Sequence, residues 1–268
     1  MPLSWANLTA SSFPLTDINS LSPKKRAITE GIKNSLGDLI VTTDADCTMG
    51  DKWIRSIASF YEAEQPKMIV SPVCISGEKT LFEKIQSLEI SGLMLMTGAS
   101  VFSRKPLMCN GANLAFSKKV FEDVNGYDTI DTLASGDDVM LMQKVQKKFP
   151  DKIRFLKSGE SIVFTSAQKT LHGFFNQRKR WASKVISVNN NFIAATGTLV
   201  YLLNFFILLS VFSLIFSDKF VVLFIAVFSA KCAIDFLFLF LSVSFLGKKN
   251  LLWLFLPSEI FQLLYITF

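Results

Sequence analysis

The chain has 268 residues, of which 50% are hydrophobic and 26 are Phe, and it carries a formal net charge of +6. This length accommodates one globular domain and a membrane region, and the apolar residues concentrate after residue 195. The modest positive charge suits phosphate-bearing ligands or an anionic membrane surface, but it is too small and too dispersed to indicate a nucleic-acid-binding protein.

Helices and strands are predicted to alternate in the first part of the chain. In chain order we expect a helix at 24–36, a strand at 38–43, a helix at 53–64, a strand at 68–75 broken at Pro72, a helix at 80–97, a strand at 112–116, helices at 117–124 and 137–149, and strands at 153–156 and 161–165. This alternation predicts an α/β fold with a mainly parallel sheet. Ligands of such sheets bind at the carboxyl ends of strands.

Membrane-length segments are predicted to follow. A helix at 170–191 mixes apolar and basic side chains, as an amphipathic helix at a membrane surface does. The segment 198–216 has no charged residue and as a helix would span about 28 Å, close to the thickness of a bilayer core. A longer apolar segment covers 220–246, and a third begins at residue 251.

We therefore divide the chain into a globular domain, 1–195, that ends in the amphipathic helix, and a membrane region, 196–268, with two to three transmembrane helices in contact with membrane lipid. Lys231 and Asp235 lie on one face of the second span, and pairing is the expected way to tolerate such charges. Basic residues precede the first span and follow the second. The positive-inside rule then predicts an integral protein of the plasma or inner membrane, with a cytoplasmic globular domain and the turn 217–219 outside.

A zinc site and a disulfide framework are not indicated. The four cysteines include no CxxC spacing, and His172 is the only histidine. A reducing, cytoplasmic setting agrees with this cysteine usage.

Two carboxylates directly follow the strand predicted at 38–43. In an extended chain Asp44 and Asp46 would point the same way, because side chains alternate along a strand. Both could then bind a divalent cation, or one could bind it while the other orients a ribose, and Mg²⁺ and Mn²⁺ prefer such oxygen ligands. By itself, however, a solvated acidic turn is the simpler explanation of this triplet.

Acidic residues also begin the helix predicted at 137–149. Asp137 and Asp138 follow Gly136, and acidic residues are favoured in the first turn of a helix, so capping alone would explain either one. The functional alternative is a single carboxylate that takes a proton from an acceptor hydroxyl. Adjacent residues point in different directions, so only one of the two should reach the site.

A motif of basic and aromatic residues lies in the predicted amphipathic helix. Gln177, Arg180 and Trp181 fall at i, i+3 and i+4, on one helix face. Arginine offers a fork of donors to a diphosphate, and tryptophan a flat wall for a sugar. A basic flank before a membrane span would explain Arg180 but not Gln177 or Trp181. The segment NGAN (110–113) is less specific, and a plain turn is its simplest interpretation.

In this order the motifs resemble those of the family 2 glycosyltransferases, in particular the membrane-bound branch that includes cellulose and hyaluronan synthases. The family's basic helix, strand and DxD motif are matched by KKRAITEGIKNSLGDLIVTTDADC, and its acceptor-side strand by CNGANLAFSKKVF followed by NGYD. GDD resembles its catalytic acidic motif, and QRKRW resembles its QxxRW motif. The resemblance covers residues 20–195 and implies a GT-A fold, which is Rossmann-like.

The resemblance implies an inverting, metal-dependent hexosyltransferase of polysaccharide biosynthesis. Asp46, with Asp44 nearby, would hold Mg²⁺ or Mn²⁺ on the diphosphate of a nucleotide-sugar, with UDP as the expected nucleotide, and Arg180 would stabilise the leaving diphosphate. Asp138 would deprotonate the hydroxyl of a glycan or lipid-linked acceptor. The residues expected to shape the acceptor and diphosphate ends of the site are Gln177, Trp181, Asp137 and Asn113.

One departure from the family pattern is expected to matter. Only about 20 irregular residues precede the basic helix, so the strands that cradle the nucleotide base in the family would be missing, as would any leading membrane helix. The alternative hypothesis is therefore a truncated, non-catalytic membrane protein or partner subunit derived from such an enzyme.

Overall fold

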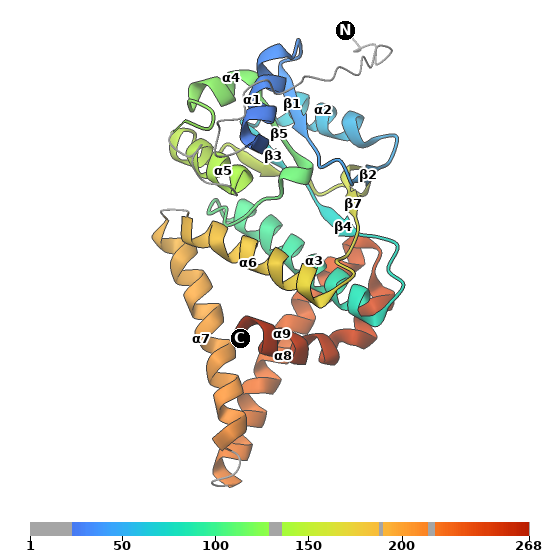
Figure 1. The fold of residues 1–268 in the computed structure, drawn as a ribbon, viewed down its shortest axis with the longest axis vertical. Coiled ribbons are helices and arrows are strands. Elements are labelled where there is room, and N and C mark those ends of the chain that lie inside the picture. Colours follow the sequence, from blue (N-terminus) through green and yellow to red (C-terminus); the bar gives the residue numbers. More distant parts are fainter. Residues whose placement is uncertain (1–22, 129–135, 188–189, 214–217, 268) are drawn as a thin grey trace.

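The computed structural model describes residues 23–128, 136–187, 190–213 and 218–267, and these form two parts (Figure 1). The upper part in that view is a layered α/β arrangement. Helices α7 (Asn191–Ser213) and α8 (Asp218–Leu246) extend from it side by side. The predicted α/β fold followed by long apolar helices is confirmed. The segment 1–22 lies outside the described residues, as does the start of the predicted turn at 217–219.

A four-stranded sheet forms the centre of the α/β part, in the order β1–β5–β3–β6. Strands β3 and β6 pair in parallel, and β5 runs antiparallel to both β1 and β3. Strands β1, β3 and β6 therefore share one direction, and β5 lies between two of them in the opposite direction. Two of the three pairings are antiparallel, so the sheet is mixed where mainly parallel pairing was expected. The bounds of these strands are Leu39–Thr42 (β1), Met68–Val70 (β3), Leu114–Ser117 (β5) and Ile153–Phe155 (β6).

A second, smaller sheet has the order β2–β7–β4, with bounds Thr48–Met49, Val163–Thr165 and Val73–Ile75. The predicted strand at 68–75 is thus divided between two sheets, and Pro72, which has no N–H to donate to a ladder, stands at the division. The two residues of β2 are too few to show a periodicity, so this strand was not predicted. Both sheets lie in the upper part of the molecule (Figure 1).

The helices of the α/β part agree closely with the predicted ranges. Thr80 caps α3 in a capping box with Glu83, and Ser117 caps α4 as expected by accepting from the N–H of Val120. The third apolar segment differs, because it begins as the 3₁₀ helix η3. The bounds are Pro23–Asn34 (α1), Trp53–Glu64 (α2), Leu81–Phe102 (α3), Lys118–Asp123 (α4), Asp137–Lys148 (α5), Leu171–Ser187 (α6), Phe255–Thr267 (α9), Gly111–Asn113 (η1), Gly159–Ser161 (η2) and Lys249–Leu254 (η3).

Both faces of the four-stranded sheet are covered by side chains. Along β3, Met68 and Val70 belong to one apolar cluster, whereas Ile69 between them belongs to another with Ala115 and Trp53. All three β3 residues are fully buried. A strand buried on both faces explains why its sequence is a continuous apolar run and not an alternating one.

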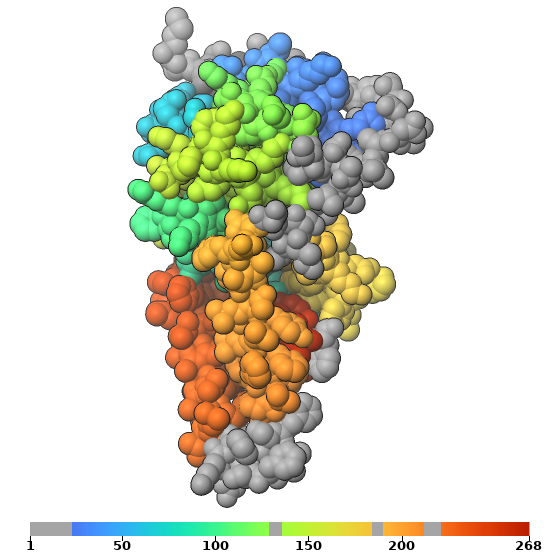
Figure 2. Space-filling view, turned by 90° about the vertical axis from the view of Figure 1, so that its left-hand side faces the viewer, coloured from blue at the N-terminus to red at the C-terminus, as the bar shows by residue number. Residues whose placement is uncertain are grey.

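Among the residues that the structure describes, four helical segments are long and apolar enough to cross a membrane, namely 81–102, 191–211, 221–246 and 249–267. The side chains of α7 and α8 are largely exposed, as lipid-facing residues would be; Leu199 is 68% exposed and Val222 is 69% exposed. These two helices extend downward from the rest of the molecule (Figure 2). Helix α3 differs because it packs against α8, where Leu88 and Leu239 share one apolar cluster.

Lys231 and Asp235 within α8 are paired, as the sequence predicted. The Nζ of Lys231 lies 2.7 Å from a carboxylate oxygen of Asp235, and it also contacts the buried carboxylate of Glu259 on α9. The second partner was not predicted. It connects the two helices by a contact that is largely shielded from the surroundings.

Replacing Lys231 with Met would leave the carboxylates of Asp235 and Glu259 together without a cation. We expect this change to lower the free energy of unfolding by about 3–5 kcal/mol, which is typical for breaking a buried ion pair. Denaturant unfolding in detergent micelles measures the loss. Lys119→Met, at an exposed position of α4, is the control and should have little effect. Equal stability of the two variants would contradict the prediction.

Candidate active site

The chain turns sharply after β1, where the first acidic motif lies. The N–H of Cys47 donates to the carbonyl of Asp44 at 3.1 Å, which closes a turn over Ala45 and Asp46. The expectation of an extended segment is therefore wrong, because this backbone hydrogen bond replaces strand geometry. Asp44 and Asp46 are presented by a turn, and Asp46 is the more exposed of the two.

Helix α5 brings the second acidic motif to the same place. Gly136 precedes it with a φ of 94°, a conformation that favours glycine, so that Asp137 and Asp138 form the first turn of the helix. The Nζ of Lys24 lies 3.0 Å from Asp44 and 3.8 Å from Asp137. One lysine thus bridges two motifs that are far apart in the sequence.

The loop at Gly111 holds Asp138 from the opposite side. The N–H of Gly111 donates to Oδ2 of Asp138 at 3.1 Å, and the hydroxyl of Thr42 donates to the carbonyl of Gly111 at 2.7 Å. A Cβ on Gly111 would lie 3.5 Å from the Cβ of Asp138, so the two residues are in close contact. Asp137 and Asp138 therefore contact different elements, and three of the four motifs meet beyond the end of β1.

The electrostatics of the site reflect this gathering of carboxylates. Burial, the largest effect, opposes the charge of Lys24, but the carboxylates of Asp137, Asp44 and Asp138 together outweigh it and raise the pKa of Lys24. Burial, followed by Asp137 and Asp138, raises the pKa of Tyr127. Tyr127, a buried member of the apolar cluster that includes Val139 of α5, is therefore a neutral phenol.

Sequence reasoning did not select Lys24, Tyr127 or Thr42 for this site. Lys24 belongs to a basic run that could contact phosphate but is more simply explained as a solvated start of the predicted helix, and Thr42 belongs to the strand predicted at 38–43. A signal for Lys24 exists in hindsight, since it belongs to the basic run before the DxD strand. Tyr127 belongs to the NGYD segment of the family resemblance, but nothing local assigned it a role, because its packing with α5 residues such as Val139 comes from the fold.

Asn113 lies apart from the carboxylates, as part of the protein core. Its side chain has no exposed surface, and its amide nitrogen donates to the carbonyls of Pro72 and Ser161 at 2.7 Å each. Its amide oxygen accepts from the indole N–H of Trp53 at 3.0 Å. In this structure the side chain of Asn113 holds η1 in place, and its hydrogen bonds go to protein groups.

The fourth motif lies on α6. Gln177 and Trp181 both contact the side chain of Arg178, which is held by Glu89 of α3. Trp181 also packs against an apolar cluster that contains Ala112, the residue after Gly111. Trp181 and Ala112 thus belong to the same apolar packing region. The side chain of Arg180 is exposed.

The oxygen ligands at the turn suit a hard divalent cation. Asp44 and Asp46 supply carboxylate oxygens of the kind that Mg²⁺ and Mn²⁺ prefer. In the ranges that the structure describes, no group of three or more His, Cys, Asp or Glu side chains could hold a metal ion. These residues therefore fit an ion that takes its remaining ligands from water or from the phosphates of a ligand, as Mg²⁺ commonly does.

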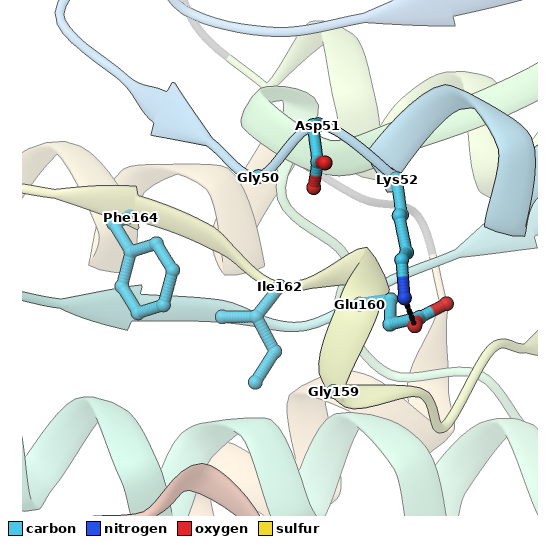
Figure 3. Close-up of a pocket in the computed structure, with 7 residues that line it drawn as sticks. All are labelled: Gly50, Asp51, Lys52, Gly159, Glu160, Ile162 and Phe164. Carbon is cyan, nitrogen blue, oxygen red and sulfur yellow. Dashed lines mark hydrogen bonds and ion pairs between the residues drawn. The ribbon is translucent and has the colours of Figure 1, made fainter.

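A separate hollow of about 230 Å³ opens at the other end of β2 (Figure 3). The ion pair of Lys52 and Glu160, at 2.8 Å, lies on its rim, and both side chains are more than half exposed. Exposed pairs of this kind contribute little to stability. The hollow is lined by Gly50, Asp51, Lys52, Gly159, Glu160, Ile162 and Phe164, and not by the carboxylates described above. We therefore place the candidate active site at the group formed by Asp44, Asp46, Asp137 and Asp138, which we call the carboxylate cluster.

Comparison with known proteins gives one family. Residues 39–257 match the family model described as "Glycosyl transferase family group 2". The match covers the acidic turn, α5, α6 and most of the apolar helices. No curated protein matches the chain.

Replacing Asn113 with Ala tests its role in the core. The indole of Trp53 and the carbonyl of Ser161 would lose their partner, and each buried group left unpaired costs about 1–3 kcal/mol. We expect the free energy of unfolding to fall accordingly, as measured by tryptophan fluorescence in denaturant. Asn34→Ala, which removes an exposed side chain that bonds within α1, should change stability far less. A smaller loss for Asn113→Ala than for Asn34→Ala would contradict this assignment.

Proposed function

The chain belongs to glycosyl transferase family group 2, and from this membership we propose that it is an inverting glycosyltransferase. It would move a sugar, with a hexose expected, from a nucleotide-sugar, with UDP expected, to a glycan or lipid-linked acceptor. The observation that carries the proposal is the meeting of Asp44, Asp137 and Asp138 beyond the end of β1, where ligands of α/β sheets bind.

The donor end of the site is assigned to the acidic turn. Asp46 and Asp44 would hold Mg²⁺ or Mn²⁺, which would supply Lewis-acid stabilisation of the charge on the leaving diphosphate. Lys24 lies between Asp44 and Asp137 and offsets the repulsion between these two carboxylates. Arg180, exposed on α6, offers further donors to the diphosphate.

The acceptor end is assigned to Asp138. In a single displacement the acceptor hydroxyl oxygen bonds to the anomeric carbon while the bond from that carbon to the diphosphate breaks. The hydroxyl proton passes to the carboxylate of Asp138, and the electron pair leaves with the diphosphate. The N–H groups of Gly111 and Val139 hold the two oxygens of this carboxylate. Asp138 is therefore oriented before an acceptor arrives.

We propose that the membrane is the location of this reaction, with the α/β part on the cytoplasmic side. The end of α8 is tied to the α/β part, because Lys248 lies 2.6 Å from Glu78. Burial opposes the charge of Glu78, but hydrogen bonds from Lys248 and Ser87 outweigh it and lower the pKa of Glu78. The positive-inside rule assigns the side that carries these basic residues to the cytoplasm.

Asp138→Asn tests the proposed base. The amide keeps an oxygen for the N–H of Gly111 but cannot take a proton, so we expect transfer to fall about 10²- to 10⁴-fold. UDP release from a panel of UDP-sugars with Mn²⁺, in membranes that contain the chain, measures the rate. Asp123→Asn on α4 is the matched control and should behave as the unmodified chain. Equal release by Asp138→Asn and the control would refute the role.

Metal dependence provides a separate test. Removing divalent ions with a chelator should abolish transfer, and Asp46→Asn should weaken Mn²⁺ binding by about 10- to 100-fold or more, because a charged ligand is lost. Electron paramagnetic resonance of Mn²⁺ measures binding in the presence of UDP. Asp51→Asn, near in sequence but on the separate hollow, is the control. Unchanged Mn²⁺ affinity in Asp46→Asn would exclude this carboxylate as a ligand.

A further inference from the structure

Arg178 on the motif helix α6 is paired with Glu89 of α3. Its Nε and one terminal nitrogen donate to the two carboxylate oxygens of Glu89 at 3.2 and 2.6 Å. The side chains of Arg178 and Glu89 are only 11% and 13% exposed. The pair therefore joins α6 to α3 through a two-pronged contact that is largely shielded from solvent.

The same guanidinium contacts two of the three motif residues. Its other terminal nitrogen donates to the side-chain oxygen of Gln177 at 2.8 Å. Its carbon lies 4.3 Å from the ring centre of Trp181 and 4.3 Å from that of Phe174. Phe174 is fully buried and so forms a fixed platform under the arginine. Trp181 rests against the same planar group.

A residue of α9 completes the arrangement. The hydroxyl of Tyr265 donates to Glu89, and the Tyr265 ring packs edge-on against Phe174. Phe261 of α9 lies against Phe174 as well. The carboxylate that holds Arg178 is therefore held in turn by a membrane-length segment of the chain.

We propose that Arg178 is a positioning residue, which fixes the side chains of Gln177 and Trp181 toward the sugar-transfer site and is itself oriented by Glu89 and Tyr265. The expected effect of Arg178 on sugar transfer rests on the proposed function, whereas the contacts around Arg178 do not. A buried ion pair is weak evidence for stability, since apolar residues can fill the same space as well. Here the pair fixes the orientation of the Arg178 side chain. A planar guanidinium donates hydrogen bonds only in its plane and stacks on aromatic rings only with its faces, so its orientation also sets where these partners lie.

Arg178→Lys is the first variant, because lysine keeps the charge but loses the fork and the flat faces. Fluorine NMR of the full chain labelled with fluorotryptophan reports the position of Trp181, whose signal is assigned by its loss in Trp181→Phe. We expect the Trp181 signal to shift or broaden, while that of Trp53 in the core stays in place. Transfer should fall by up to ~100-fold, as a misplaced group in an active site can cause.

A control shows whether losing any arginine fork has the same effect. Arg104 pairs with Asp151 at 3.3 Å, but its side chain is 70% exposed. Arg104→Lys should leave the Trp181 signal and the transfer rate unchanged. The exchange variant Arg178→Glu with Glu89→Arg restores the charge pair but moves the guanidinium away from the α6 position. We expect it to fold with the Trp53 signal in place and yet to remain impaired in transfer.

The outcomes separate this inference from the proposed function. A Trp181 signal that does not move in Arg178→Lys would overturn the positioning role, whatever the activity. A signal that moves without loss of transfer in an active chain would also overturn it, and so would full recovery of transfer in the exchange variant. If the unmodified chain transfers no sugar from any donor, the proposed function fails, and the Trp181 signal still decides whether Arg178 sets the orientation of the motif.

Discussion

The buried ion pair between Glu89 and Arg178 is the contact on which the relation of the two parts depends. It lies where α3, α6 and α9 meet, and aromatic rings from all three helices pack around it. Charges placed in such surroundings must be paired, so the pair permits few arrangements of these helices. Because α6 continues to the first apolar span, the pair also fixes where the membrane helices begin relative to the sheet.

Helix α3 packs both against the sheet and against the membrane region. At Gly98 it approaches the sheet so closely that an added Cβ would lie 3.2 Å from the ring of Phe155. At Gly92 it lies against Leu239 of α8, and the hydroxyl of Ser242 donates to the carbonyl of Ser91. Small residues at these positions allow close packing on both sides of α3. The membrane region is therefore held in place relative to the sheet through this helix.

The carboxylates of Asp44, Asp137 and Asp138 lie close together, and neighbouring groups of the protein offset their mutual repulsion. Several acids near one strand end repel one another, and the donors around them offset this repulsion. Asp44 and Asp137 share Lys24, whereas Asp138 accepts from the N–H of Gly111. The first turn of α5 adds the favourable end of a helix dipole. In the proposed reaction, acids held in this way would be available to a cation and to an acceptor hydroxyl.

The sequence by itself determined what depends on neighbours within one or two helical turns. It predicted α2 at Trp53–Glu64 and the pairing of Lys231 with Asp235, because periodicity, caps and i,i+4 spacing are local. The order of the four motifs also indicated the family. The tertiary structure alone decided the direction of β5 and the commitment of Asn113 to the core. It also decided the contact of Glu89 with Arg178, because these features join segments whose meeting depends on how the whole chain packs.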